Sequence, residues 1–186
     1  MWQLHPLVFI FIAIGLLLVA LAVFTSVRKD YRMKGRLSPM GSSIQLGYFC
    51  AYALSSYVFL DSRISNIRTT GGQFLLSIIL MSVGFAAVLF SMPALGRRSF
   101  GREVGKLNTA GLYSYSRNPQ LVGGFLFMLG YALLWPSWQG MLWASLWIPI
   151  SYFMVRGEEE HLMRIFGQEY RDYCDKIPRY IGLPKW

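Results

Sequence analysis

Residues 7–27 read LVFIFIAIGLLLVALAVFTSV, and this stretch contains no charged side chain. An α-helix rises about 1.5 Å per residue, so roughly 20 apolar residues are needed to cross the hydrocarbon core of a bilayer. The stretch is too long for the apolar part of a signal peptide, and its basic residues follow it instead of preceding it. We therefore predict that residues 7–27 form a membrane-spanning helix.

Four further apolar stretches lie at 44–60, 74–95, 121–135 and 141–155, and a short turn at 136–140 separates the last two. The composition agrees with this pattern, because 54% of the 186 residues are hydrophobic and only 15% are charged, against about 25% charged in soluble domains. The sequence predicts an all-α polytopic membrane protein with about five transmembrane helices. It excludes a disordered chain, a disulfide-rich secreted module and an ordinary cytosolic enzyme.

The basic residues of the connecting segments indicate the orientation in the membrane. Segments 28–43, 96–118 and 156–186 together hold 16 of the 18 Lys and Arg residues, and the other connections hold only Arg63 and Arg68. Because cytoplasmic loops carry the excess of Lys and Arg, we expect the N-terminus outside and the C-terminal tail in the cytoplasm. The net charge of +9 then suits anionic lipid headgroups, and nucleic-acid binding is not expected.

Two smaller patterns also predict features of the fold. Four tryptophans surround the last turn, at positions 135, 138, 143 and 147, and we expect them to form an aromatic belt at the outer membrane interface. Cys50 lies in an apolar stretch and Cys174 in the tail, so a disulfide between them is not expected.

Polar residues gather at the two ends of the hairpin formed by 121–135 and 141–155. Residues 118–119 precede this hairpin and residues 156–160, which read RGEEE, follow it, so both should emerge at the same membrane surface. Pro119 either simply starts a helix or frees amides that would hold a carboxylate or phosphate together with Arg117. One carboxylate of 158–160 either faces solvent or pairs with a cation or a ligand ammonium.

Several signatures of soluble enzymes are missing from the chain. Residues 101–107 are one residue short of a phosphate-binding P-loop and lack its Ser or Thr. His5 and His161 have no partner at metal-ligand spacing, so a metal site is not expected. Tyr170 and Tyr173 share one face of a short helix and serve either as packing residues or as a cover over a cofactor.

The order of these motifs resembles a known family. The run GLYSYSRNP at 111–119, a helical hairpin, Glu158-Glu159, and then FGQEY at 166–170 with Tyr173 is similar to the isoprenylcysteine carboxyl methyltransferase and phospholipid methyltransferase group of integral membrane methyltransferases. The resemblance covers about the last 75 residues, and little of it extends into the first 95.

The resemblance implies that S-adenosylmethionine binds at the cytoplasmic surface and that a lipophilic small molecule, lipid or isoprenylcysteine-like acceptor enters from the bilayer. Residues 96–186 would form the cofactor-binding core and residues 1–95 the acceptor side. The membrane would be the cytoplasmic membrane of a prokaryote or the endoplasmic reticulum of a eukaryote. The implied catalytic residues are Glu159 and Arg156. The implied cofactor-binding residues are Tyr113, Arg117, Asn118, Pro119, Glu158, Glu159, Tyr170 and Tyr173.

Three positions depart from the family pattern. Asn118 replaces a common His, Leu121 replaces a Tyr, and Met154 stands where the prenylcysteine enzymes have an arginine that Arg156 could replace. These differences leave the methyl acceptor open. Two alternative functions remain open. One is a sterol-type NAD(P)H reductase, because the C-terminal ending of such enzymes is similar to residues 173–179, although they usually have more membrane spans. The other is a non-catalytic membrane scaffold.

Overall fold

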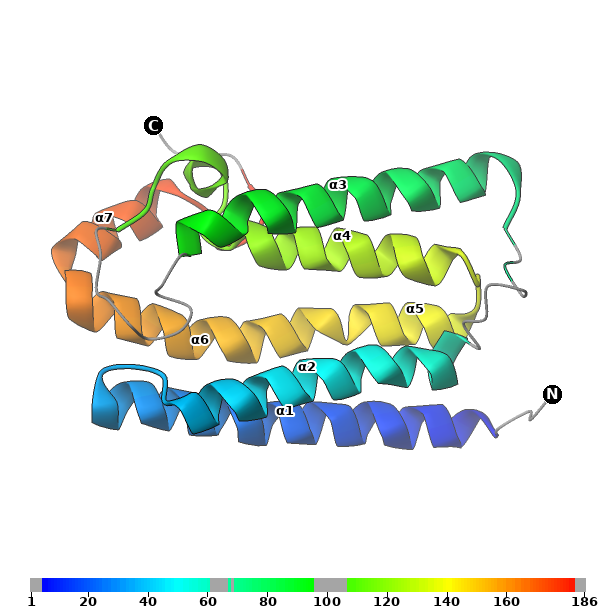
Figure 1. Cartoon of the computed structure of the whole chain (residues 1–186), viewed down its shortest axis with the longest axis horizontal. Helices are drawn as coiled ribbons and strands as arrows, with labels where there is room; N and C mark the ends of the chain where they lie inside the picture. The colour runs from blue at the N-terminus through cyan, green and yellow to red at the C-terminus, as the bar shows by residue number, and fades with distance from the viewer. Residues whose placement is uncertain (1–4, 61–66, 68, 96–106, 183–186) are drawn as a thin grey trace.

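The computed structural model describes residues 5–60, 67, 69–95 and 107–182 (Figure 1). All regular structure in these residues is helical, as predicted. Successive long helices run in opposite directions, so the chain passes back and forth along one axis (Figure 1). The elements are α1 (Pro6–Lys34), α2 (Pro39–Leu60), α3 (Gly71–Leu95), η3 (Gly111–Ser114), α4 (Pro119–Leu133), α5 (Trp138–Ser145), α6 (Trp147–Phe166) and α7 (Gln168–Lys176).

Three helices, α1, α2 and α3, are long and apolar enough to cross a membrane. Helix α4 is apolar but has only 15 residues. The fifth predicted span, 141–155, consists of most of α5 and the first half of α6, which meet at Leu146. Leu146 keeps helical backbone angles (φ −60°, ψ −24°), and Pro149 removes the backbone N–H that would have continued the hydrogen bonding. The count of five spans and their orientation therefore stay predictions.

Helices α3 and α4 pack through a seam of small residues. Ser77, Gly84 and Ser91 recur every seven residues on α3 and are buried. A Cβ atom on Gly84 would lie 2.5 Å from the carbonyl oxygen of Gly123 on α4, and one on Gly130 would lie 2.7 Å from that of Ser77. Such small residues let helix backbones approach closely within a bilayer. The seam fixes α4, whose N-terminus carries the 117–119 motif.

Ring contacts and hydrogen bonds of two tryptophans connect helices α2, α4, α5 and α6. The indole of Trp143 stacks on Tyr52 with ring centroids 5.1 Å apart, and its Nε1 donates to the Tyr52 carbonyl at 3.2 Å. The Tyr52 hydroxyl in return donates to the Trp143 carbonyl at 2.7 Å. Trp147 Nε1 donates to the Leu121 carbonyl of α4 at 2.9 Å. These hydrogen bonds give each indole N–H a partner inside an apolar interior.

The expected aromatic belt is therefore wrong for three of the four tryptophans. The exposed fractions are 5% for Trp135, 3% for Trp143 and 8% for Trp147, whereas Trp138 is 49% exposed. The physical reason is that backbone carbonyls of α2 and α4 satisfy the indoles of Trp143 and Trp147, which allows them to be buried.

Charged residues join the ends of α1 and α6. Glu160 of α6 pairs with Arg28 and, at 2.9 Å, with Arg32 of α1, and these guanidinium groups lower the pKa of Glu160 to about 2. Beside them the Tyr31 and His161 rings stack with centroids 4.4 Å apart. Helix α6 is thereby held against α1 at the end of the molecule where the polar motifs lie.

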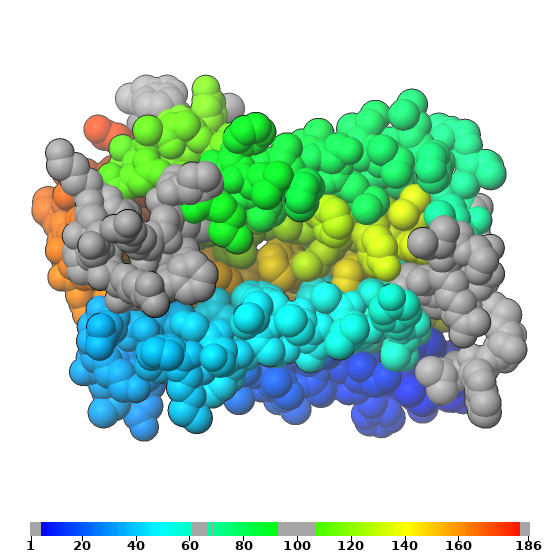
Figure 2. All heavy atoms as spheres, in the orientation of Figure 1, coloured from blue at the N-terminus to red at the C-terminus, as the bar shows by residue number. Residues whose placement is uncertain are grey.

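The space-filling view shows a hollow between α2 and α3 (Figure 2). Helix α2 packs on α1 and α5, whereas α3 packs on α4. Parts of the α4 and α5–α6 layer are visible at the bottom of the hollow (Figure 2). The hollow is therefore floored by this layer and opens to the outside on this face (Figure 2).

We expect Gly123→Ala to destabilise the protein, because its new Cβ would meet the Gly84 carbonyl oxygen at 2.7 Å. Overpacking of this kind costs about 1–3 kcal/mol. Thermal unfolding in detergent, followed by circular dichroism, measures the effect. Gly15→Ala is the matched control, since Gly15 has nothing within 4 Å of such a Cβ. Equal unfolding temperatures for the two variants would contradict close packing at this seam.

Candidate functional site

Most of the residues singled out from the sequence meet at one end of the bundle. Helix η3, the start of α4, the end of α6 and α7 lie together there (Figure 1). Arg117, just before α4, reaches Glu159 on α6 with 2.9 Å between Nη1 and Oε1. The structure therefore confirms that 118–119 and 156–160 lie close together, while their place at a membrane surface stays a prediction.

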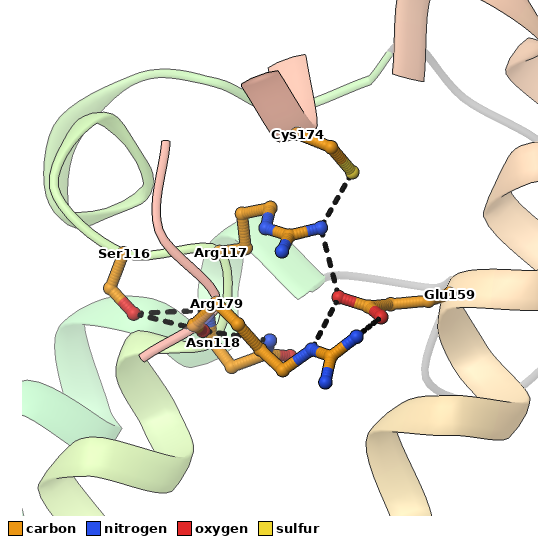
Figure 3. Close-up of polar contacts among 6 residues, drawn as sticks. All are labelled: Ser116, Arg117, Asn118, Glu159, Cys174 and Arg179. Carbon is orange, nitrogen blue, oxygen red and sulfur yellow. Dashed lines mark hydrogen bonds and ion pairs between the residues drawn. The ribbon is translucent and has the colours of Figure 1, made fainter. Parts of the chain in front are cut away.

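Glu159 is the centre of this arrangement (Figure 3). Its carboxylate accepts from Arg117 and also from both sides of the Arg179 guanidinium, with Nε 3.1 Å from Oε1 and Nη2 2.5 Å from Oε2. The side chains of Glu159 and Arg117 are only 15% and 12% exposed. Bidentate pairing of this kind is the strongest geometry available to an arginine and a carboxylate. We call Arg117, Glu159 and Arg179 the arginine–glutamate cluster.

The cluster carries one more positive charge than negative charge. Arg117 also donates from Nη1 to the Cys174 sulfur, but its Nε is buried and has no hydrogen-bond partner among the described residues. A buried N–H without a partner costs free energy, which a ligand acceptor would relieve. The cluster is therefore suited to an anionic group such as a carboxylate.

Residues 116–118 hold the C-terminal segment that supplies Arg179. The Asn118 side-chain amide donates to the Arg179 carbonyl at 3.0 Å, and the Arg117 backbone N–H donates to the Pro178 carbonyl at 2.9 Å. Asn118 is buried, with 6% exposed, and Pro119 begins α4. In this structure Asn118 thus positions the tail.

Arg179 was not among the residues predicted from the motifs. It lies after α7 and outside the pattern that carries the family resemblance. The sequence singled out Arg179 only as part of the run 173–179, which is similar to the ending of sterol-type reductases and gave no indication of an ion pair with Glu159.

The three tyrosines predicted to bind the cofactor all lie inside the protein. Tyr113, Tyr170 and Tyr173 are buried, with 7%, 2% and 7% exposed. The Tyr173 hydroxyl donates to the Tyr113 carbonyl at 2.7 Å, and Tyr170 and Tyr173 pack with Ile177 in a small apolar core. Burial raises the pKa of Tyr170 and of Tyr173, so both hydroxyls stay protonated at neutral pH. Their contact with a cofactor stays a prediction.

Glu158 and Arg156 lie outside the cluster. Glu158 has no hydrogen bond or ion pair within the described residues, and burial together with the neighbouring Glu159 charge raises its pKa to about 7. Arg156 is exposed and stands over the Tyr152 ring, with its guanidinium carbon 5.8 Å from the ring centroid. Arg156 does not pair with Glu160, which binds α1 instead.

Removing the central carboxylate should destabilise the fold. We expect Glu159→Ala to cost about 3 kcal/mol, because it leaves the buried Arg117 charge without a counter-ion. Glu169→Ala, at an exposed position in the first turn of α7, should leave stability nearly unchanged. Denaturant or thermal unfolding of both variants tests this, and a Glu159→Ala protein as stable as Glu169→Ala would argue against a stabilising cluster.

Glu158 should make stability depend on pH. Its pKa is raised above the ordinary 4.5 to about 7. The protonated side chain therefore contributes its full stabilisation to the fold below about pH 4.5, and this stabilisation is lost as pH rises through 7. We expect wild type to lose about 2 kcal/mol relative to Glu158→Gln between pH 5 and pH 8. Unfolding temperatures across this range provide the measurement. Parallel pH curves for the two proteins would show that Glu158 does not titrate there.

Similar proteins are known for parts of this chain. The protein-S-isoprenylcysteine O-methyltransferase of Schizosaccharomyces pombe is 37% identical over 79 residues, which are 41% of this chain and 33% of that protein. The mouse protein of the same name is 37% identical over 82 residues, 42% of this chain and 27% of that protein. The phosphatidylethanolamine N-methyltransferase of Meyerozyma guilliermondii is 25% identical over 117 residues, 61% of this chain and 13% of that protein.

The chain spans a third or less of the length of each of these relatives. No solved structure matches it. The family model described as phospholipid methyltransferase matches residues 72–169, which are more than half of the chain and run from the start of α3 into α7. The matched region includes Arg117 and Glu159 of the arginine–glutamate cluster. The chain therefore belongs to the phospholipid methyltransferase family.

Proposed function

We propose that this protein is an integral membrane methyltransferase that transfers a methyl group from S-adenosylmethionine to a lipophilic acceptor. The observation that carries the proposal is the arginine–glutamate cluster, in which the two halves of the family motif meet. In this proposal the chain crosses the membrane five times with its N-terminus outside. The cluster then faces the cytoplasm, and residues 96–186 bind the cofactor.

The cluster fits the charges of S-adenosylmethionine. The methionine part of this molecule carries a carboxylate, which suits the unpartnered Nε of Arg117 and the surplus positive charge of the two arginines. Its ammonium and sulfonium groups suit the carboxylates of Glu158 and Glu159 and the faces of nearby tyrosines. When bound, S-adenosylmethionine supplies an electrophilic methyl group on positively charged sulfur.

The two glutamates have different tasks in this proposal. Both oxygens of Glu159 already accept from guanidinium groups, so Glu159 positions Arg117 and Arg179 and lends negative charge to the cofactor site without acting as the base. Glu158 has a pKa of about 7 and is the better proton acceptor at neutral pH. An amine acceptor arrives as an ammonium ion and must lose a proton before its nitrogen can be methylated, whereas a carboxylate acceptor is already ionised.

The hollow between α2 and α3 supports entry of the acceptor from the side (Figure 2). Both helices expose apolar residues, among them Leu54 of α2 at 64% and Val83 of α3 at 52%. A lipophilic acceptor partitions into the bilayer, so an opening toward lipid gives it a path to the bundle interior. This supports the proposal that residues 1–95 form the acceptor side.

Calorimetric titration of the detergent-purified protein tests the proposal. We expect saturable binding of S-adenosylmethionine and S-adenosylhomocysteine and none of NADPH. Glu159→Ala should weaken binding at least about tenfold, which corresponds to 1.4 kcal/mol, while Glu169→Ala should bind as wild type does. Binding of NADPH alone would support the reductase alternative. Absence of all binding by a folded sample would support a scaffold.

A further inference from the structure

A groove runs between the first two helices, α1 and α2, which lie side by side (Figure 1). Its volume is about 560 Å³, and it is lined by positions 12 to 23 of α1 and positions 44 to 51 of α2. Gly15 and Gly47 belong to this lining, and a Cβ atom added to either would have nothing within 4 Å. The groove is therefore space that the side chains of the described residues leave open.

The groove offers a ligand almost purely apolar surface. Among the lining residues only Tyr48 has a polar atom in its side chain, and this hydroxyl donates to the Leu16 carbonyl at 3.2 Å. A polar ligand would lose its hydrogen bonds to water there without replacement. From position 12 to position 23 the groove extends for roughly 16 Å along the α1 axis, and one leaflet of the hydrocarbon core is about 15 Å thick. Its chemistry and its length thus both fit an acyl chain.

Positive charge without a partner lies beyond one end of the groove. Positions 23 and 44 form the end nearest the turn that joins α1 to α2. Lys29 and Arg36 are exposed there and have no ion pair within the part of the chain that the structure describes. Lys29 follows Gly15 after about four helical turns and therefore lies on the same side of α1. The apolar groove thus leads to cations that no described carboxylate balances.

We propose that this groove binds an anionic phospholipid, with an acyl chain between α1 and α2 and the phosphate near Lys29 and Arg36. Charge complementarity selects the lipid class, because two cations without carboxylate partners attract a headgroup of net negative charge more strongly than a zwitterionic one. Lys29 lies roughly 9 Å along the helix axis beyond Val23, at the end of the groove. One lipid molecule can therefore contact the groove and the cations together.

This lipid is distinct from the methyl acceptor. Arg28 and Arg32, which pair with Glu160 of α6, are rotated from Val23 by about 140° and 180° around the α1 axis. The groove therefore faces away from α6 and from the arginine–glutamate cluster. It also precedes residues 72–169, which the family model matches. The inference thus goes beyond the proposed function, because it adds a bound lipid that the reaction does not consume.

A second copy of the chain fits the groove less well than a lipid does. Two copies in one membrane have the same orientation, so packing groove against groove would bring their Lys29 and Arg36 side chains together at one end. Like charges repel each other. The charges that favour an anionic lipid therefore oppose this dimer.

Native mass spectrometry of the detergent-purified full chain tests the lipid class. Protein is mixed with equal amounts of phosphatidylglycerol and phosphatidylcholine that have identical acyl chains, and the bound lipids are counted. We expect wild type to retain at least about tenfold more phosphatidylglycerol, and the double variant Lys29→Gln, Arg36→Gln to lose this preference. The matched double variant Arg171→Gln, Lys176→Gln removes the same charge at exposed positions of α7 and should keep it.

Filling the groove tests where the lipid binds. We expect the double variant Gly15→Leu, Gly47→Leu to retain about tenfold less phosphatidylglycerol, because the new side chains would occupy the open space. Ala53→Leu, at an exposed position on another face of α2, should bind as wild type does. Saturating phosphatidylglycerol should also raise the unfolding temperature of wild type by roughly 5 °C and leave that of the groove-filled variant unchanged.

Four results would overturn the inference. Equal retention of the two lipids by wild type would show that the site does not select charge, and unchanged retention by the groove-filled variant would place the lipid elsewhere. Dimers of wild type that become monomers in the groove-filled variant would assign the groove to a second copy. Full competition by water-soluble glycerophosphoglycerol would indicate a site for free phosphate esters. Because no measurement here involves methyl transfer, failure of the proposed function would leave this test intact.

Discussion

A single carboxylate shared by two arginines holds the polar end of this molecule together. Glu159 lies on α6, Arg117 before α4 and Arg179 after α7. Taking such charges out of water is unfavourable unless each has a partner in good geometry. Because neither arginine has another carboxylate among the described residues, the turn before α4 and the C-terminal segment must both be placed around α6. Asn118 and the backbone of Arg117 reinforce the same arrangement through carbonyls of the tail.

The bundle that carries this end is stabilised without a strong hydrophobic force between helices, since lipid is as apolar as the side chains. Helices α3 and α4 instead approach until backbone nearly meets backbone at Gly84 and Gly123. Elsewhere, hydrogen bonds from Tyr52, Trp143 and Trp147 join α2, α5, α6 and α4. These contacts leave a hollow between α2 and α3 on one face of the bundle (Figure 2).

Features that depend on a local sequence pattern were predictable from the sequence. Features that depend on which distant residues form hydrogen bonds or ion pairs with each other were not. Long apolar runs predicted the helices and their order, and the predicted hairpin correctly placed 118–119 near 156–160, where Arg117 pairs with Glu159. The burial of Trp143 was missed because its acceptor, a carbonyl of α2, lies far away in sequence. The ion pairs of Arg179 with Glu159 and of Arg28 with Glu160 were missed for the same reason, because sequence spacing does not specify ion pairs between long side chains on different helices. The span count and the roles of the site residues stay predictions.

The dependence of the cluster on Arg179 sets the order in which the site is completed as the chain is made. Ribosomes synthesise the polypeptide from the N-terminus, so α1 to α6 are all available for insertion before residue 179 leaves the exit tunnel. Until then Glu159 has only Arg117 as a described partner, and the turn at 116–118 has no tail carbonyl to bind. The contacts of residues 116–118 with the tail therefore form only after α1 to α6 have been synthesised.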